Sequence, residues 1–242
     1  MKRYPVLTWR INLAKLASLL ICLAAWFVIA GSTAWGGTIK GSVRFTGAAV
    51  EQKKFPVTTD QYVCGTEIVA EDIVLSSNKG LRNAVVSLQD GPPGAKWKAP
   101  LSTVRIDQKQ CMYMPHVVVV PVGGTVEFLN GDRLVHNHRS TSTANAPFNL
   151  AHPTARPIRV VFKQPEIVHV QCDFHPWMRA WVVVADHPFY AVTTDRGEFT
   201  VNNVPPGKYT LQVWQESLGT VTKGVTVGDK GITTVAVEMS QK

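Results

Sequence analysis

Short stretches of alternating hydrophobic and polar residues, separated by turns rich in glycine, proline and asparagine, make up most of the chain. Ile39, Val43 and Phe45, for example, fall on one side of an extended backbone between residues 37 and 45. Alternation of this kind is typical of strands with one buried face. Helical periodicity is nearly absent after the N-terminal stretch, so the pattern predicts an all-β chain that folds as β-sandwiches.

The strongest strand signals lie in the middle of the chain. Residues 117–120 are four consecutive valines, which indicates a strand covered on both faces. Further on, Val168, Val170 and Cys172 share one face of another predicted strand. The same alternation predicts that the Cys172 side chain points inward at the end of that strand. Residues 181–184 are expected to return as the next strand.

The first 34 residues are expected to be a signal peptide rather than part of the fold. Four basic residues precede the apolar run Leu16–Ala30, and Ser32-Thr33-Ala34 offers small residues for cleavage after Ala34. The run is short for a membrane span, which needs about 20 residues. Export to the periplasm, or export of another kind, is therefore predicted, with an uncleaved N-terminal anchor as the alternative and no membrane span after cleavage.

Charge narrows the range of partners. The chain has 242 residues and a formal net charge of +8. Without residues 1–34 it keeps 21 of its 25 basic residues and all 17 acidic ones, a net charge of +4. These charges are spread along the chain, whereas nucleic-acid binding requires a dense basic stripe with interleaved aromatic residues. No nucleic-acid partner is expected.

One short segment concentrates metal-binding side chains. Cys172, His175 and Met178 follow each other in the spacing C-x-x-H-x-x-M. A thiolate, an imidazole and a weak axial thioether are the donors that a mononuclear blue-copper site takes from one loop, and a second imidazole completes its plane. His136 and His138 are both candidates for that imidazole. They share a face of an extended strand, so the period alone does not choose between them.

These motifs resemble the cupredoxins of the amicyanin- and plastocyanin-like type. The resemblance rests on the ligand loop and on an N-x5-H-N segment formed by Asn130, His136 and Asn137. It also includes the stretches 113–115 and 120–126.

The cupredoxin resemblance implies a Greek-key β-sandwich that binds one type 1 copper ion. The implied ligands are His136, Cys172, His175 and Met178. It further implies that Asn137 ties the strand of His136 to the cysteine segment, and that the far edge of His175 faces solvent as an electron port.

The remaining histidines are not expected to bind copper. His138 is expected at the rim of the site, and the alternative is that it contacts the ligands from behind. His116, His152, His169 and His187 are expected to be solvated or structural, because their spacing forms no second cluster.

The C-terminal part resembles another family. Residues 193–199 and 204–209 carry T-D-x-G-x-F and P-P-G-x-Y patterns that are similar to those of carboxypeptidase-regulatory-like (prealbumin-like) β-sandwich domains. Strand patterns at 37–43 and 83–88 resemble the opening of such a domain. The chain is therefore predicted to be one smaller sandwich split into residues 36–92 and 187–242, with a cupredoxin domain at 96–186 inserted between them. The alternative is a cupredoxin with an extended N-terminus and a separate C-terminal module.

The predicted export bears on the pairing of the cysteines. If Cys172 holds copper, Cys64 and Cys111 remain as a pair. Disulfides persist in oxidising compartments, so a Cys64–Cys111 bond is expected. The alternative is two buried free thiols.

The cupredoxin resemblance implies an electron carrier, not an enzyme, that exchanges single electrons with redox proteins of the cytochrome or dehydrogenase class. A periplasmic copper-binding or delivery protein is one alternative, and an envelope docking module with a copper domain is another. A copper nitrite reductase is least supported, because no second histidine cluster is visible.

Overall fold

The computed structural model describes residues 36–93, 101–132 and 134–241. The predicted signal peptide lies outside the described residues. None of the helices in the described part of the chain has the length and apolar character needed to cross a membrane. The predicted all-β class is confirmed, because the described residues form several sheets and one short helix, α2.

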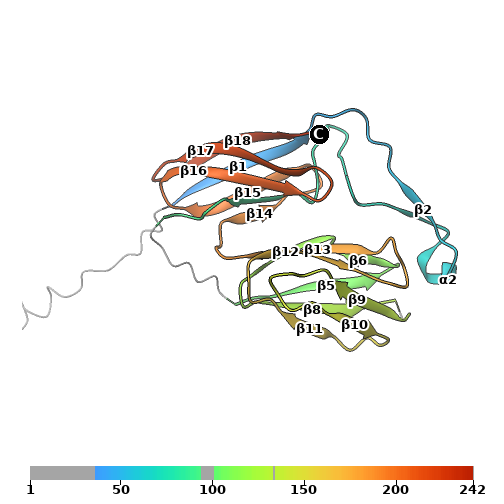
Figure 1. The fold of residues 1–242 in the computed structure, drawn as a ribbon. Helices are drawn as coiled ribbons and strands as arrows, with labels where there is room; N and C mark the ends of the chain where they lie inside the picture. The colour runs from blue at the N-terminus through green and yellow to red at the C-terminus, as the bar shows by residue number, and fades with distance from the viewer. Residues whose placement is uncertain (1–35, 94–100, 133, 242) are drawn as a thin grey trace, which may run out of the picture. The chain divides into compact units, whose positions relative to one another are not determined.

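Seven strands from the two ends of the described chain share two sheets (Figure 1). One sheet has the order β15-β1-β18 and the other the order β14-β4-β16-β17. Their bounds are β1 Gly37–Phe45, β4 Val85–Leu88, β14 Tyr190–Val192, β15 Glu198–Val204, β16 Gly207–Gln215, β17 Gly219–Val227 and β18 Ile232–Met239. The side chains of Ile39, Val43 and Phe45 are buried in the core between these sheets, as their alternation predicted.

The middle of the chain supplies a second pair of sheets. One has the order β10-β9-β12-β13-β7 and the other the order β11-β8-β5-β6. Their bounds are β5 Thr103–Lys109, β6 Met112–Met114, β7 Val117–Pro121, β8 Thr125–Asn130, β9 His136–Ser140, β10 Asn149–His152, β11 Ile158–Val161, β12 Glu166–Gln171 and β13 Arg179–Ala185.

The buried pattern of this second sandwich follows the sequence. All five residues of β7 are buried, as the run of valines predicted. Val168, Val170 and Cys172 are buried together in the core of this sandwich, so the inward position of Cys172 is confirmed. Strand pairing separates β5–β13 from β1, β4 and β14–β18. The boundaries 36–92, 96–186 and 187–242 stay predictions.

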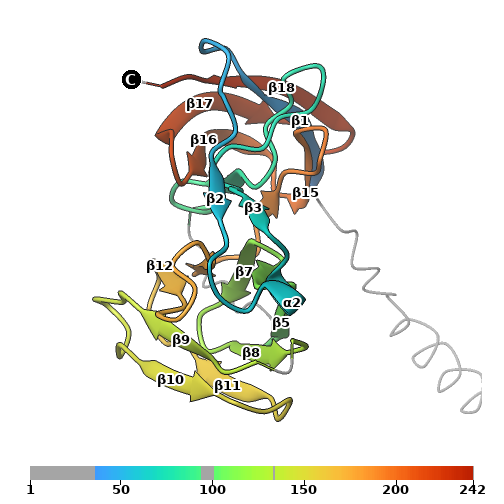
Figure 2. The same cartoon turned by 90° about the vertical axis from the view of Figure 1, so that its right-hand side faces the viewer.

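A third element comes from the predicted first part of the smaller sandwich. Strands β2 (Lys54–Pro56) and β3 (Glu67–Val69) form a two-stranded antiparallel sheet, and α2 (Gln61–Cys64) lies in the connection between them (Figure 2). Residues 54–69 are called the cap below. Val57, Cys64 and Ile68 of the cap are buried in the same cluster as Cys172, so the cap packs on the core of β5–β13.

Candidate metal centre

The predicted ligand loop is a tight connection between two paired strands. β12 ends at Gln171 and β13 begins at Arg179, and these two residues face each other in the antiparallel ladder. Inside the loop, the Met178 amide donates to the His175 carbonyl at 2.8 Å, and the Cys172 amide donates to the Met178 carbonyl at 3.1 Å. These backbone bonds fix the spacing of the three side chains because they close the loop on itself.

The structure brings His136, Cys172 and His175 together. The Nδ1 atoms of the two histidines lie 3.1 Å apart, and each lies 3.9 Å from the Sγ atom of Cys172. All three residues are buried. His136 is the first residue of β9, so its donor atom comes from a different strand of the same sheet as β12.

These three distances fit a single metal ion. The point equidistant from the three donor atoms lies about 2.1 Å from each, which is close to ordinary metal–nitrogen and metal–sulfur bond lengths. Two nitrogens and one thiolate sulfur around one point form the His2Cys plane of a blue-copper site. The donor set therefore fits copper.

Each histidine has a carboxylate on its outer nitrogen. The Nε2 atom of His136 lies 3.1 Å from Oδ2 of Asp132, and the Nε2 atom of His175 lies 3.2 Å from Oδ2 of Asp60. A carboxylate accepts a hydrogen bond, so Nε2 carries a proton in both imidazoles. With a metal bound, the Nδ1 atoms would carry no proton and their lone pairs would face Cys172, whereas without a metal an Nδ1–H group can donate to the Cys172 thiolate. Two lone pairs directed at each other across 3.1 Å are stabilised by a cation between them.

The electrostatics favour a thiolate at Cys172. Burial raises the pKa of its thiol, but hydrogen bonds from His136 and His175 outweigh burial and lower the pKa to about 6. The thiolate is the form that binds metals. Burial likewise raises the pKa of Asp132, and hydrogen bonds from His136 and from the amides of Cys111 and Gln110 bring it below the usual range.

Met178 is fully buried in the same cluster as Cys172, at the end of the loop. The predicted thioether residue is therefore in the protein interior, and its backbone is hydrogen-bonded to Cys172 and His175. The predicted tie between strand and loop is also present. Oδ1 of Asn137 accepts the Asp173 amide at 2.7 Å, and Nδ2 of Asn137 donates to Asp173 Oδ2 at 2.8 Å.

Some expectations about the histidines are wrong. His175 is only 1% exposed, so its edge is not the solvent-facing port that the family resemblance implied. The cap lies against His175 through Asp60, and the cupredoxin resemblance gave no sign of such a segment. His138 is fully buried rather than placed at the rim, because it packs between Tyr113 and Phe128.

None of the other four histidines is exposed. His116, His152 and His187 are buried, and His169 is half-buried. His152 pairs with His138, since its Nδ1 lies 2.8 Å from Nε2 of His138. His116 contacts Glu216, whose other oxygen accepts a hydrogen bond from the Trp181 indole at 2.8 Å.

Sequence reasoning missed both carboxylates. Asp132 lies inside the Asn130–His136 segment, four residues before the histidine that it contacts, so its position offered a signal. Asp60 is 115 residues from His175 and offered none. The predicted Cys64–Cys111 disulfide is confirmed, and it joins the last residue of α2 to the turn between β5 and β6.

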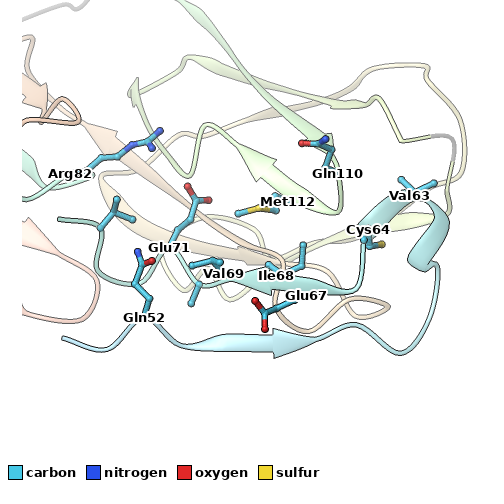
Figure 3. Close-up of a pocket in the computed structure, with 13 residues that line it drawn as sticks. Gln52, Val63, Cys64, Glu67, Ile68, Val69, Glu71, Arg82, Gln110 and Met112 are labelled. Atoms are coloured by element: carbon cyan, nitrogen blue, oxygen red, sulfur yellow. The ribbon is translucent and has the colours of Figure 1, made fainter. Parts of the chain in front are cut away.

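A cavity of about 510 Å³ lies beside the cap (Figure 3). Figure 3 shows Val63 and Cys64 of α2, Ile68 of β3 and Met112 of β6 among the residues that line it. None of the four predicted metal ligands lines this cavity. The candidate metal centre is therefore separate from it.

Comparison with known proteins supports the assignment of the C-terminal part. Residues 175–240 match the family model of the carboxypeptidase regulatory-like domain, which is the resemblance predicted for this part of the chain. The match begins at His175, within the ligand loop. No curated protein matches the chain.

Solved structures similar to the chain include cupredoxins. A purple cupredoxin from Nitrosopumilus maritimus is 27% identical over 34% of this chain and 98% of its own, with a TM-score of 0.30. A mutant of amicyanin in the Cu(I) form is 20% identical over 41% of this chain and 98% of its own, with a TM-score of 0.33.

A Cu-containing nitrite reductase from Thermus scotoductus SA-01 is also similar. It is 27% identical over 39% of this chain and 24% of its own, with a TM-score of 0.33. The chain thus spans about a quarter of the length of that enzyme. The donor atoms of this chain, rather than these likenesses, carry the assignment of a metal centre, and the family match describes residues 175–240 alone.

Proposed function

We propose that the chain is an exported type 1 copper protein that carries single electrons between redox partners. The observation that carries this proposal is the convergence of Cys172 Sγ with the Nδ1 atoms of His136 and His175 around one point. A copper ion bound there supplies one-electron exchange between Cu(I) and Cu(II).

The residues of the site suit that role. The Cys172 thiolate and the imidazoles of His136 and His175 are held by neighbouring strands and by Asp132 and Asp60, so the donors keep their positions whichever charge the metal carries. Burial of all four predicted ligands excludes water and leaves no open position for a substrate. No group is required to transfer a proton, which is why the proposal is an electron carrier and not an enzyme.

The closed site also bears on the alternative of copper delivery. A delivery site has to exchange its ion with another protein, which favours exposed ligands. Here the ligands are buried and His175 is covered by the cap. Export is supported by the N-terminal basic and apolar pattern and by the Cys64–Cys111 disulfide, which persists in oxidising compartments. The partners belong to the redox proteins, of the cytochrome or dehydrogenase class.

Copper loading with spectroscopy tests the proposal. Mature protein loaded with Cu(II) should show an intense absorption toward the red end of the visible spectrum and the paramagnetic signal of a copper–thiolate bond. Cys172→Ser should lose the colour. His187→Gln, which changes a buried imidazole that contacts the Leu88 carbonyl instead, is the matched control and should keep it. A colourless wild-type Cu(II) complex would contradict the proposal.

A further inference from the structure

The cap places a carboxylate from outside the second sandwich on a predicted copper ligand. Oδ2 of Asp60 lies 3.2 Å from Nε2 of His175, across 115 residues of sequence. The His175 side chain is 1% exposed, and the Asp60 side chain is 37% exposed. Asp60 thus stands between the imidazole edge and solvent.

The local backbone shows that the Asp60 carboxylate is not needed by its own helix. Aspartate at the start of a helix usually accepts hydrogen bonds from the first free amides. Asp60 precedes α2 but makes no such side-chain bond, and only its backbone carbonyl accepts the amides of Val63 and Cys64. Its φ of 55° lies in the left-handed region, which aspartate tolerates better than most residues. The carboxylate is left free to contact His175.

Several independent contacts hold the cap in this position. The Cys64–Cys111 disulfide bonds α2 to the second sandwich. Val57 and Ile68 are buried in the same cluster as Cys172. Within the cap, the Val57 amide donates to the Thr66 carbonyl at 3.0 Å, and the Gln61 side chain donates to the Val57 carbonyl at 2.6 Å. Because a disulfide and buried apolar side chains both hold it, the cap stays in place over this part of the second sandwich.

We propose that the cap is a built-in cover of the copper centre and that Asp60 is the residue that positions His175. This inference rests on the proposed function, since it concerns the same site. Asp60 accepts the Nε2 proton of His175, which fixes the tautomer and directs Nδ1 toward Cys172. The cap closes the imidazole edge to chelators and to direct contact with a redox partner, so a partner meets the surface of the cap instead.

Two substitutions distinguish the effect of the Asp60 carboxylate from that of its left-handed backbone conformation. Asp60→Gly removes the side chain, and glycine adopts a positive φ at no steric cost. Asp60→Asn keeps the shape of the side chain and removes its charge. Glu67→Gln is the matched control, because Glu67 lies in the same cap and pairs with Lys54 on the exposed side.

The first measurement uses the metal-free protein. Nitrogen-15 NMR of the His175 ring should show a single tautomer with a slowly exchanging Nε2 proton in the wild type and in Glu67→Gln. In Asp60→Gly the proton should exchange with solvent at least tenfold faster. The second measurement is the rate at which EDTA removes Cu(II), which we expect to rise about 10–100-fold in Asp60→Gly and less in Asp60→Asn.

The outcomes distinguish this inference from the proposed function. Unchanged ring exchange and unchanged copper removal in Asp60→Gly would overturn the cover, even if the protein is blue. A colourless wild-type protein would overturn the electron carrier, while faster ring exchange in the metal-free Asp60→Gly variant would still support the cover.

Discussion

The Oδ2 atom of Asp132 lies 3.1 Å from the Nε2 atom of His136 and also accepts the amide of Cys111 at 2.8 Å. One carboxylate therefore joins a predicted copper ligand to the residue that anchors the cap. His136 and His175 each present Nδ1 to Cys172 and Nε2 to a carboxylate, so the two imidazoles are oriented in the same way from two different parts of the chain.

Removing the charge of Asp132 should weaken copper binding. Asp132→Asn removes the acceptor that keeps the Nε2 proton of His136 in place, and partners of this kind change metal affinity by about 10–100-fold. Competition with a chromophoric chelator measures the affinity. Asp107→Asn is the control, because Asp107 accepts the nearby Gly131 amide rather than a ligand imidazole, and the affinity should stay unchanged. Equal losses in both variants would contradict the role given to Asp132.

Truncating Asn137 should loosen the ligand loop. Asn137→Ala leaves the Asp173 amide without its acceptor and removes a second bond to the Asp173 side chain, which should lower the free energy of unfolding by about 1–3 kcal/mol. Urea unfolding measures this loss. Asn202→Ala removes an exposed contact with Thr38 and should cost less than about 0.5 kcal/mol. A loss for Asn137→Ala no larger than that of the control would be inconsistent with the tie.

Acid should destabilise the metal-free protein partly through His138. Burial, together with the charges of His152 and His136, lowers the pKa of His138 to about 3 from a model-peptide value of 6.5. Between these values the unfolded chain binds a proton that the folded chain does not. The contribution of His138 to stability is thus complete above pH 6.5 and declines as the pH falls toward 3, by up to about 1.4 kcal/mol per pH unit.

Urea unfolding of the metal-free protein across pH 4–8 measures this slope. His138→Gln has no titrating group at this position, so its free energy of unfolding should fall less steeply than that of the wild type below pH 6.5. Parallel curves for the two proteins would show that His138 does not contribute.

Loss of the Cys64–Cys111 bond should cost stability as well as loosen the cap. The two cysteines are 47 residues apart, and the loop-entropy relation gives about 4 kcal/mol for a loop of that length, with measured losses usually in the range of about 2–4 kcal/mol. Unfolding of a Cys64→Ser, Cys111→Ser double variant by urea measures the difference. A loss below about 1 kcal/mol would mean that the apolar contacts of Val57 and Ile68 hold the cap by themselves.

The sequence by itself determined what depends on neighbouring residues. Alternation placed Ile39, Val43 and Cys172 on buried faces, because side-chain direction in a strand follows directly from residue number. The order of Cys172, His175 and Met178 put three donors in one loop, since a short connection between paired strands keeps its residues together.

The tertiary structure decided what depends on contacts between distant segments. Strand period left His136 and His138 open, and only the family resemblance favoured His136. In the structure Nδ1 of His136 lies 3.9 Å from Cys172 Sγ, whereas Nε2 of His138 contacts His152. The cap, the burial of His175 and the contact of Asp60 arise from a disulfide and a buried cluster that join residues far apart in the chain. The disulfide could be predicted from the two cysteines that remain once Cys172 is assigned to the metal, but the buried cluster and the Asp60 contact have no local period and could not.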